Sequence, residues 1–244
     1  VAMIPFISCI ASTTLPLLSH KKDAVVNQLI RDVAAGKTLV TTALIEPGNE
    51  EPSSPFTSAA QVNGQWQLTG SKHCVPYAAQ SSRVLLFAKA SGQLWAGLVE
   101  TSAAGVTLKP QLVTTGEPQY LLELNSAPAH CVAEGEAAQR LLQVVSAMTM
   151  AACCAMSVGV ADKMMRLTGQ YTTERIQFGV PVATFQAAAH RLANTYIDVE
   201  CLKINAQKAA SDVAEGIYDS DAIHMAKIWC GDVMHRTSHS AQHL

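Results

Sequence analysis

The stretch Glu174–Leu192, ERIQFGVPVATFQAAAHRL, says more about the fold than any other part of the chain. Arg175, an amide and an aromatic side chain stand directly before Gly179, and Pro181 follows before a new apolar-periodic run. Gly and Pro so placed are typical of a turn between two helices. The guanidinium could bind a diphosphate, and the ring of Phe178 could pack on another ring. These residues alone favour a capped helix–helix corner, and a ligand site stays open as the alternative.

Helical patterns lie on both sides of this corner. The run Leu141–Ala161 carries no charged residue over about 21 positions, a length that suits either a membrane span or a helix buried on all sides in a bundle. Because small residues abound and the pattern continues into Asp162, we favour the buried bundle helix and expect no membrane span. Residues 185–202 and 221–244 predict two further helices. Their expected buried positions are Phe185, Ala188, Leu192, Tyr196, Val199 and Leu202 in the first, and Ile223, Ala226, Ile228 and Val233 in the second.

The first half of the chain has a different hydrophobic pattern. Residues 1–38 favour one or two helices, with Gly36 as a C-terminal stop. Short apolar or alternating runs then predict strands, and Asn63–Gly64 predicts a hairpin because both residues tolerate positive φ. We therefore expect an α+β chain with three parts: 1–38, the end of an N-terminal helical domain; 39–130, a central antiparallel β domain; and 131–244, a C-terminal helical domain. The strand runs are 38–46, 65–70, 83–90, 93–100 and 106–113.

Composition excludes several classes of protein. Hydrophobic residues make up 49% of the 244 residues and charged residues 15%, which excludes wholesale disorder. The net charge of −2, without a basic stripe, argues against nucleic-acid binding. The seven cysteines include no CxxC pair, which argues against a disulfide framework or a zinc ribbon. We therefore expect a reducing, cytoplasmic setting.

Two features concern the ends of the chain. The sequence begins at Val1 and stops at Leu244 within a segment of helical pattern, so we expect the chain to be the interior of a longer one. His235, His239 and His243 share one helix face near that end. The outer two would lie roughly 12 Å apart along a helix axis, too far to share one ion, so no metal site is predicted.

The corner resembles a known signature. RIQFGVPVATFQ, residues 175–186, is similar to the R-x-Q-F-G-x-P-x-x-x-F-Q motif of the acyl-CoA dehydrogenases. ALIEPG (43–48) resembles their A-x-T-E-P strand, LTGSK (68–72) their L-N-G-x-K segment, and 238–242 the run whose Gln precedes a Gly-Gly pair. The resemblance covers nearly the whole chain, and it implies a helical domain, a central β domain and a C-terminal four-helix bundle.

This resemblance implies an FAD site shared between subunits. The strand matching 42–48 and the segment matching 74–76 would hold the flavin, and a neighbouring subunit would bind its adenosine diphosphate end. An oligomer is then required, either a homo-oligomer or a heteromer, as a dimer of dimers. The residues implied to bind the cofactor are Leu44, Ile45, Cys74, Val75 and Pro76 in the first group, and Arg175, Gln177, Phe178, Phe185, Gln186 and Gln242 in the second.

The chain also departs from the family pattern. Ile45 replaces the usual Thr, Cys74-Val75-Pro76 replaces W-I-T, and residues 49–55 replace the G-x-G-S-D loop. Thr149 occupies the position where some relatives carry their catalytic Glu, and a hydroxyl cannot serve as a carboxylate base. In the commoner arrangement that Glu follows the Gly-Gly pair, which lies beyond Leu244. The catalytic base is therefore unknown.

The implied reaction is α,β-desaturation of an acyl-CoA thioester, an oxidation at a CH–CH bond within lipid β-oxidation. A carboxylate removes the α-proton, the β-hydrogen leaves as hydride to the flavin, and electrons pass on to an electron-transfer flavoprotein. Small residues along 141–161 suggest a wide pocket for a bulky or sterol-derived acyl group, with a fatty acyl group as the alternative. A second hypothesis is a non-catalytic partner subunit that lends flavin-binding residues to its neighbour.

Overall fold

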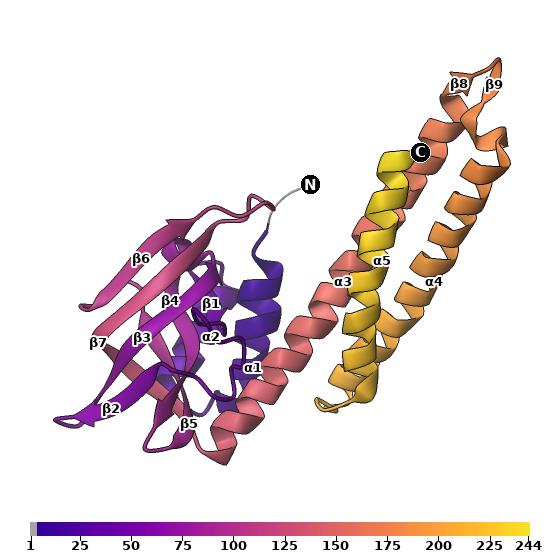
Figure 1. The fold of residues 1–244 in the computed structure, drawn as a ribbon. Coiled ribbons are helices and arrows are strands. Elements are labelled where there is room, and N and C mark those ends of the chain that lie inside the picture. Colours follow the sequence, from indigo (N-terminus) through magenta and orange to yellow (C-terminus); the bar gives the residue numbers. More distant parts are fainter. Residues whose placement is uncertain (1–3) are drawn as a thin grey trace. The chain divides into compact units, whose positions relative to one another are not determined.

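The computed structural model describes residues 4–244, and the chain divides into two compact units between Thr149 and Met150. This division falls within the long helix α3 (Glu136–Glu174). The chain is α+β, as expected: helices lead into a β sheet, and helices follow it (Figure 1).

The N-terminal helical segment is a succession of short elements. A π-helix, η1 (Phe6–Thr14), runs into α1 (Leu15–Leu17) and the 3₁₀ turn η2 (Leu18–His20), and α2 (Ala24–Ala34) follows. Asp23 caps α2, because its Oδ1 accepts hydrogen bonds from the backbone N–H groups of Val25 and Val26 at 2.8 and 3.1 Å. Gly36, at φ +68°, lies just past the end of α2, which confirms the predicted helix stop.

Seven strands make up the sheet of the first unit, and η3 (Ala78–Gln80) is a 3₁₀ turn between two of them. Five of the strands fall on the predicted runs, whereas β2 and β7 were not predicted. The Asn63–Gly64 hairpin is confirmed, since Val62 pairs with Gln65 and the two turn residues have φ of 50° and 80°. The strands are β1 (Leu39–Ala43), β2 (Ser58–Val62), β3 (Gln65–Pro76), β4 (Ser81–Ala90), β5 (Gln93–Glu100), β6 (Val106–Gln111) and β7 (Gln119–Glu134).

Pairing in this sheet is mixed, whereas the sequence predicted an antiparallel domain. β4 pairs in parallel with β1 and, at Ser58↔Lys89, with β2, while the other pairs are antiparallel. The path β4–β2–β3–β7–β5 returns to β4, so the pairings form a closed circuit. Successive strand residues point to opposite faces, and both faces are buried here: Leu85 and Phe87 belong to one core cluster, Val84 and Leu86 to the other.

The second unit consists of the later part of α3, a short two-stranded hairpin and two more helices. The hairpin strands are β8 (Ile176–Gln177) and β9 (Val180–Pro181), followed by the turn η4 (Val182–Thr184). α4 (Gln186–Ala214) and α5 (Asp221–His243) then lie side by side (Figure 1).

Most predicted buried positions of α4 and α5 are confirmed. Ala188, Val199 and Leu202 are buried on α4, and Ile223, Ala226 and Val233 on α5. Three predictions are wrong, because Phe185, Tyr196 and Ile228 are 38%, 55% and 69% exposed. The buried residues in the later part of α4 include the small residues Ala206 and Ala209, which allow close approach of a neighbouring helix.

α3 carries the apolar run of the sequence. Among residues 4–244 it is the one helix of sufficient length and hydropathy to cross a membrane, a property that core helices of soluble proteins share. The prediction that it is buried on all sides is wrong for this chain. Only 28% of its most apolar window is buried, and Met156 and Leu167 are 56% and 52% exposed.

Candidate functional site

The corner between α3 and α4 is a tight β-hairpin. Ile176 pairs with Pro181 and Gln177 with Val180, which leaves Phe178 and Gly179 as the two turn residues. Their φ values of 54° and 81° are both left-handed, the geometry of a type I′ turn. Gly adopts this backbone freely, while Phe adopts it only when the surroundings hold it there.

The hairpin presents an aromatic ring at its tip. The side chain of Phe178 is 93% exposed, and its ring meets that of Phe185 edge to face, with the centroids 6.1 Å apart and the planes at 89°. Such aromatic pairs contribute about 0.5–1.5 kcal/mol beyond their buried area. The pair therefore fixes the start of α4 against the hairpin and leaves one face of Phe178 available to another surface.

Polar side chains surround this ring. Arg175 is fixed through its backbone, since its N–H donates to the Tyr171 carbonyl at 2.8 Å and its own carbonyl accepts from Val182 at 2.9 Å. The side chains of Arg175, Gln177 and Gln186 are exposed, and none makes a hydrogen bond or ion pair with another residue of the range 4–244. The corner thus offers one guanidinium and two amides as unused donors, which fits a diphosphate ligand.

Gln242 was grouped with the corner from the sequence. It is exposed in the last turn of α5, and within residues 4–244 no hydrogen bond joins it to the hairpin. The corner as the structure presents it therefore consists of Arg175, Gln177, Phe178, Phe185 and Gln186.

The second candidate group lies in the sheet, after β1 and at the end of β3. The N–H of His73 donates to the carbonyl of Ile45 at 3.0 Å, which brings the two predicted segments, 44–45 and 74–76, together. Leu44 is half-buried, Ile45 is 37% exposed and Cys74 is exposed. Cys74 has φ 53° at a register shift of the β3–β7 ladder.

The segment 74–76 has few groups left to offer a ligand. The N–H of Cys74 donates to Oε1 of Gln111 at 2.8 Å, and Pro76 has no N–H. Val75 pairs with Tyr120, and its side chain is fully buried in the core. The residues of the corner therefore fit the diphosphate half of FAD, while residues 74–76 present little hydrogen-bonding capacity to the flavin ring.

A buried ion pair that was not predicted from the sequence adjoins this segment. Lys72 on β3 is fully buried, and its Nζ lies 2.7 Å from Oε1 of Glu46, which is 2% exposed. The same carboxylate accepts hydrogen bonds from Phe56 N at 2.5 Å, Thr57 N at 2.9 Å and Thr57 Oγ1 at 2.6 Å. Glu46 thereby anchors both ends of the loop 47–56, which departs from the family pattern.

The hydrogen bonds decide the ionisation of this carboxylate. Burial alone raises the pKa of Glu46, but the bonds from Lys72, Thr57 and Phe56 outweigh it and lower the pKa to about 2. Burial also lowers the pKa of Lys72, while Glu46 acts in the opposite direction. Each partner of the pair favours the charged form of the other, so the pair is stable only as a unit.

Thr149 forms part of a polar cluster with the N-terminal helix. Its Oγ1 lies 2.8 Å from Ser12 Oγ and 2.6 Å from the carbonyl of Val145. Thr42 on β1 donates to the carbonyl of Ser12 at 2.8 Å and lies 2.7 Å from the hydroxyl of Thr13. These hydroxyls satisfy one another, so Thr149 ties α3 to η1 and offers no basic group for proton abstraction.

Known proteins share this arrangement of helices and sheet. Residues 134–244 match the family model described as the acyl-CoA dehydrogenase, C-terminal domain. Acyl-CoA dehydrogenase FadE28 of Mycobacterium tuberculosis is 30% identical over 230 residues, which cover 93% of this chain and 64% of FadE28. This chain belongs to the acyl-CoA dehydrogenase family. The chain spans 64% of the length of FadE28 and 57% of the length of a second relative, acyl-CoA dehydrogenase FadE27 of the same organism.

Two solved structures extend the comparison. A variant of the Tcur3481-Tcur3483 steroid ACAD has a TM-score of 0.90 and 28% identity, and the match covers 99% of this chain and 65% of that one. The ChsE4-ChsE5 complex from Mycobacterium tuberculosis has a TM-score of 0.87 and 25% identity, with the same coverage. Enzymes of this family are FAD-dependent oxidoreductases, and within residues 4–244 no cluster of His, Cys, Asp and Glu is placed to hold a metal.

Proposed function

We propose that this chain is part of an FAD-dependent acyl-CoA dehydrogenase that introduces an α,β double bond into an acyl-CoA thioester. The observation that carries the proposal is the Phe178 hairpin, where Arg175, Gln177 and Gln186 keep their donors unused around an exposed ring. FAD, when bound, supplies the capacity to accept the β-hydrogen as hydride. Arg175 would neutralise the charge of its diphosphate, and the amides of Gln177 and Gln186 would orient it.

We propose further that the acyl group is bulky, of the steroid side-chain kind, and that the assembly is an oligomer of the heteromeric type. Support comes from the relatives, since one is named a steroid ACAD and another is a complex of two different chains. The exposed small and apolar residues of α3, such as Gly159 and Val160, leave room for a large apolar ligand or a neighbouring helix. An electron-transfer flavoprotein is the proposed electron acceptor.

A second candidate function is a partner subunit that lends its corner to a neighbour and holds no flavin of its own. Residues 74–76 favour it. The amide of Cys74 is used by Gln111, Pro76 has none, and the side chain of Val75 points into the core. Ile45 also removes a hydroxyl at the adjoining strand. A chain of this kind would complete a flavin site without carrying out the reaction.

Flavin content separates the two candidates. The protein that contains this chain is purified alone, and its FAD per chain is measured from the visible spectrum, before and after adding steroid-derived or linear acyl-CoA. One FAD per chain with bleaching by acyl-CoA supports the enzyme. FAD that is bound only after a second, different subunit is added supports the partner role.

Variants of the corner provide the control. Arg175→Gln should reduce FAD retention by about tenfold, because a charged hydrogen bond to diphosphate is lost. Retention is measured in the chain alone for the enzyme and in the complex with the second subunit for the partner role. Arg140→Gln alters an exposed arginine whose one side-chain partner within residues 4–244 is Glu136, and it should leave FAD retention unchanged. Equal FAD retention in both variants contradicts the proposed role of the corner.

A further inference from the structure

A basic groove runs between α4 and α5, and its lining begins at Ala187, next to Gln186 of the hairpin corner. Its cavity has a volume of about 520 Å³. The side chains that line it come from both helices. Those with donor groups are His190, Arg191, Asn194 and Thr195 on α4, and His235, Arg236, His239 and Ser240 on α5. Aromatic six-membered rings and apolar side chains larger than Ala are absent from the lining, so the groove is built for a polar ligand.

Arg191 is the residue whose hydrogen bonding is incomplete. Its Nη1 atom is buried and has no hydrogen-bond partner within residues 4–244. A guanidinium N–H removed from water without an acceptor is unfavourable, and charged donors carry the larger penalty. Arg191 therefore requires an acceptor that the described residues do not supply.

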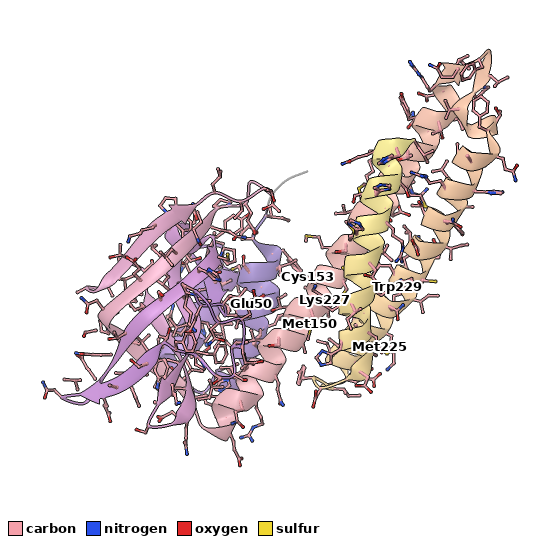
Figure 2. The ribbon with its side chains drawn as sticks, viewed as in Figure 1. Glu50, Met150, Cys153, Met225, Lys227 and Trp229 are labelled. Atoms are coloured by element: carbon pink, nitrogen blue, oxygen red, sulfur yellow. The ribbon has the colours of Figure 1, made fainter. Side chains whose placement is uncertain are left out.

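The nearby acidic side chain is already engaged. Asp198 accepts two hydrogen bonds from Arg236, from Nε at 2.7 Å and from the second guanidinium nitrogen at 2.9 Å. The Arg236 guanidinium also lies over the ring of Trp229, 4.9 Å from its centre, and Figure 2 shows Trp229 on α5. This bidentate pair neutralises Asp198 and leaves the charge of Arg191 unbalanced.

His239 lies in these positive surroundings. The pKa of His239 lies below its usual value because of His243 first, then burial, and then Arg191 and His235. The other charged or titratable side chains of the groove are His190 and Asp198 on α4 and Arg236 on α5. Asp198 is the acidic one, and it is paired, so cationic groups face His239 from both helices.

We propose that the α4–α5 groove is a binding site for an oxyanion of the phosphate class, and that Arg191 is the main residue that binds it. The planar fork of the guanidinium matches two oxygens of a phosphate group. His190, His239 and Ser240 provide further donors from the two walls. The volume exceeds that of a single phosphate, so free phosphate and the phosphate groups of a nucleotide both fit. The inference stands on α4 and α5 alone and does not depend on FAD.

Calorimetric titration with inorganic phosphate, at low salt and about pH 6.5, tests the site in the chain. We expect saturable binding that Arg191→Gln weakens about tenfold or more, with Arg191→Lys intermediate because it keeps the charge and loses the fork. Arg166→Gln is the matched control: this arginine is exposed on α3, bonds Asp162 at 2.7 Å, and should have no effect. Absence of saturable binding, or equal affinity in the Arg191→Gln and Arg166→Gln variants, overturns the proposal.

Histidine NMR gives a readout that separates the site from general instability. Bound phosphate should raise the pKa of His239 toward its usual value, because an anion offsets the surrounding positive charge. An unchanged pKa of His239 at saturating phosphate overturns the assignment. If Arg191→Gln does not fold, the calorimetric titration with phosphate is repeated on the double variant His190→Asn, His239→Asn, which should also bind more weakly than the wild type. ADP forms the second arm: tighter binding than phosphate that also depends on Arg191 identifies a nucleotide as the source, and weaker binding identifies free phosphate.

Discussion

Lys72 Nζ lies 2.7 Å from Glu46 Oε1, and both side chains are shielded from solvent. The two residues are 26 positions apart, and they join β3 to the segment between β1 and the loop 47–56. This contact positions the segments that carry Ile45 and Cys74. It is therefore the structural support of the sheet half of the candidate site.

Lys72→Met should lower the free energy of unfolding of the first unit by about 3–5 kcal/mol, because Glu46 is left as an unpaired buried charge. Denaturant unfolding followed by the fluorescence of Trp66 and Trp95 measures this change. Lys109→Met is the matched control. Lys109 also lies 2.7 Å from a glutamate, Glu123, but that pair is largely exposed and should contribute about 1 kcal/mol or less. Similar losses in the two variants would contradict the assigned role of Lys72.

The same pair predicts a specific acid sensitivity. The pKa of Glu46 is about 2 in the folded chain, against an ordinary value of 4.5. A folded pKa below the unfolded one gives stability that is present above about pH 4.5 and is lost as the pH falls toward 2. From about pH 5 to about pH 2.5, the wild-type chain should lose about 2–3 kcal/mol more than Glu46→Gln. Parallel pH curves for the two proteins would exclude Glu46 as the source.

Gly97 on β5 predicts a steric limit in the sheet. A Cβ at this position would lie 2.1 Å from the ring of Trp95 and 2.4 Å from the carbonyl oxygen of His130. Gly97→Ala should therefore destabilise the chain by about 1–3 kcal/mol. Gly159→Ala on α3, where a Cβ meets no atom within 4 Å, should instead stabilise it by about 0.5–1 kcal/mol. The sign of each change in unfolding midpoint is the measurement, and a stabilising Gly97→Ala refutes the packing argument.

Asp23 combines a helix cap with a contact to the sheet. Its Oδ1 caps α2, and its Oδ2 lies 2.8 Å from Nε2 of His130 on β7. Asp23→Ala should cost about 1–2 kcal/mol of stability, and Asp23→Asn should cost less because the amide oxygen still caps the helix. Amide hydrogen exchange at Val25 and Val26 checks the effect. Unchanged exchange in Asp23→Ala would show that the cap is dispensable.

Local patterns in the sequence were enough to predict most elements of the fold. The run 93–100 is apolar between Gln93 and Glu100 and coincides with β5, and Asn63–Gly64 marks the turn between β2 and β3. β2 escaped prediction because SAAQV lacks large apolar residues. β7 escaped because Asn125, Ser126 and Pro128 interrupt it, and Ser126 takes φ 52° within the strand. Turn-type residues inside a bulged strand cannot be distinguished from a loop by periodicity.

The candidate site, like the fold, could be predicted from the sequence only in part. The corner is local in sequence, so Arg175, Gln177 and Phe178 could be selected from a short motif. The Glu46–Lys72 pair and the Arg191 groove depend on residues 26 to about 50 positions apart, and only the fold brings them together. A charged residue within an otherwise apolar run, as in residues 43–48, is the available signal for such a pair.

The turn at Phe178 and Gly179 has a consequence for the speed and strength of assembly. Both backbone angles are already set by the hairpin, and Phe185 restrains the ring, so little conformational freedom remains to be lost when another surface covers it. A rigid aromatic projection of this kind docks without prior rearrangement. In the proposed oligomer, subunit association at this corner should then be limited by diffusion and orientation rather than by local folding.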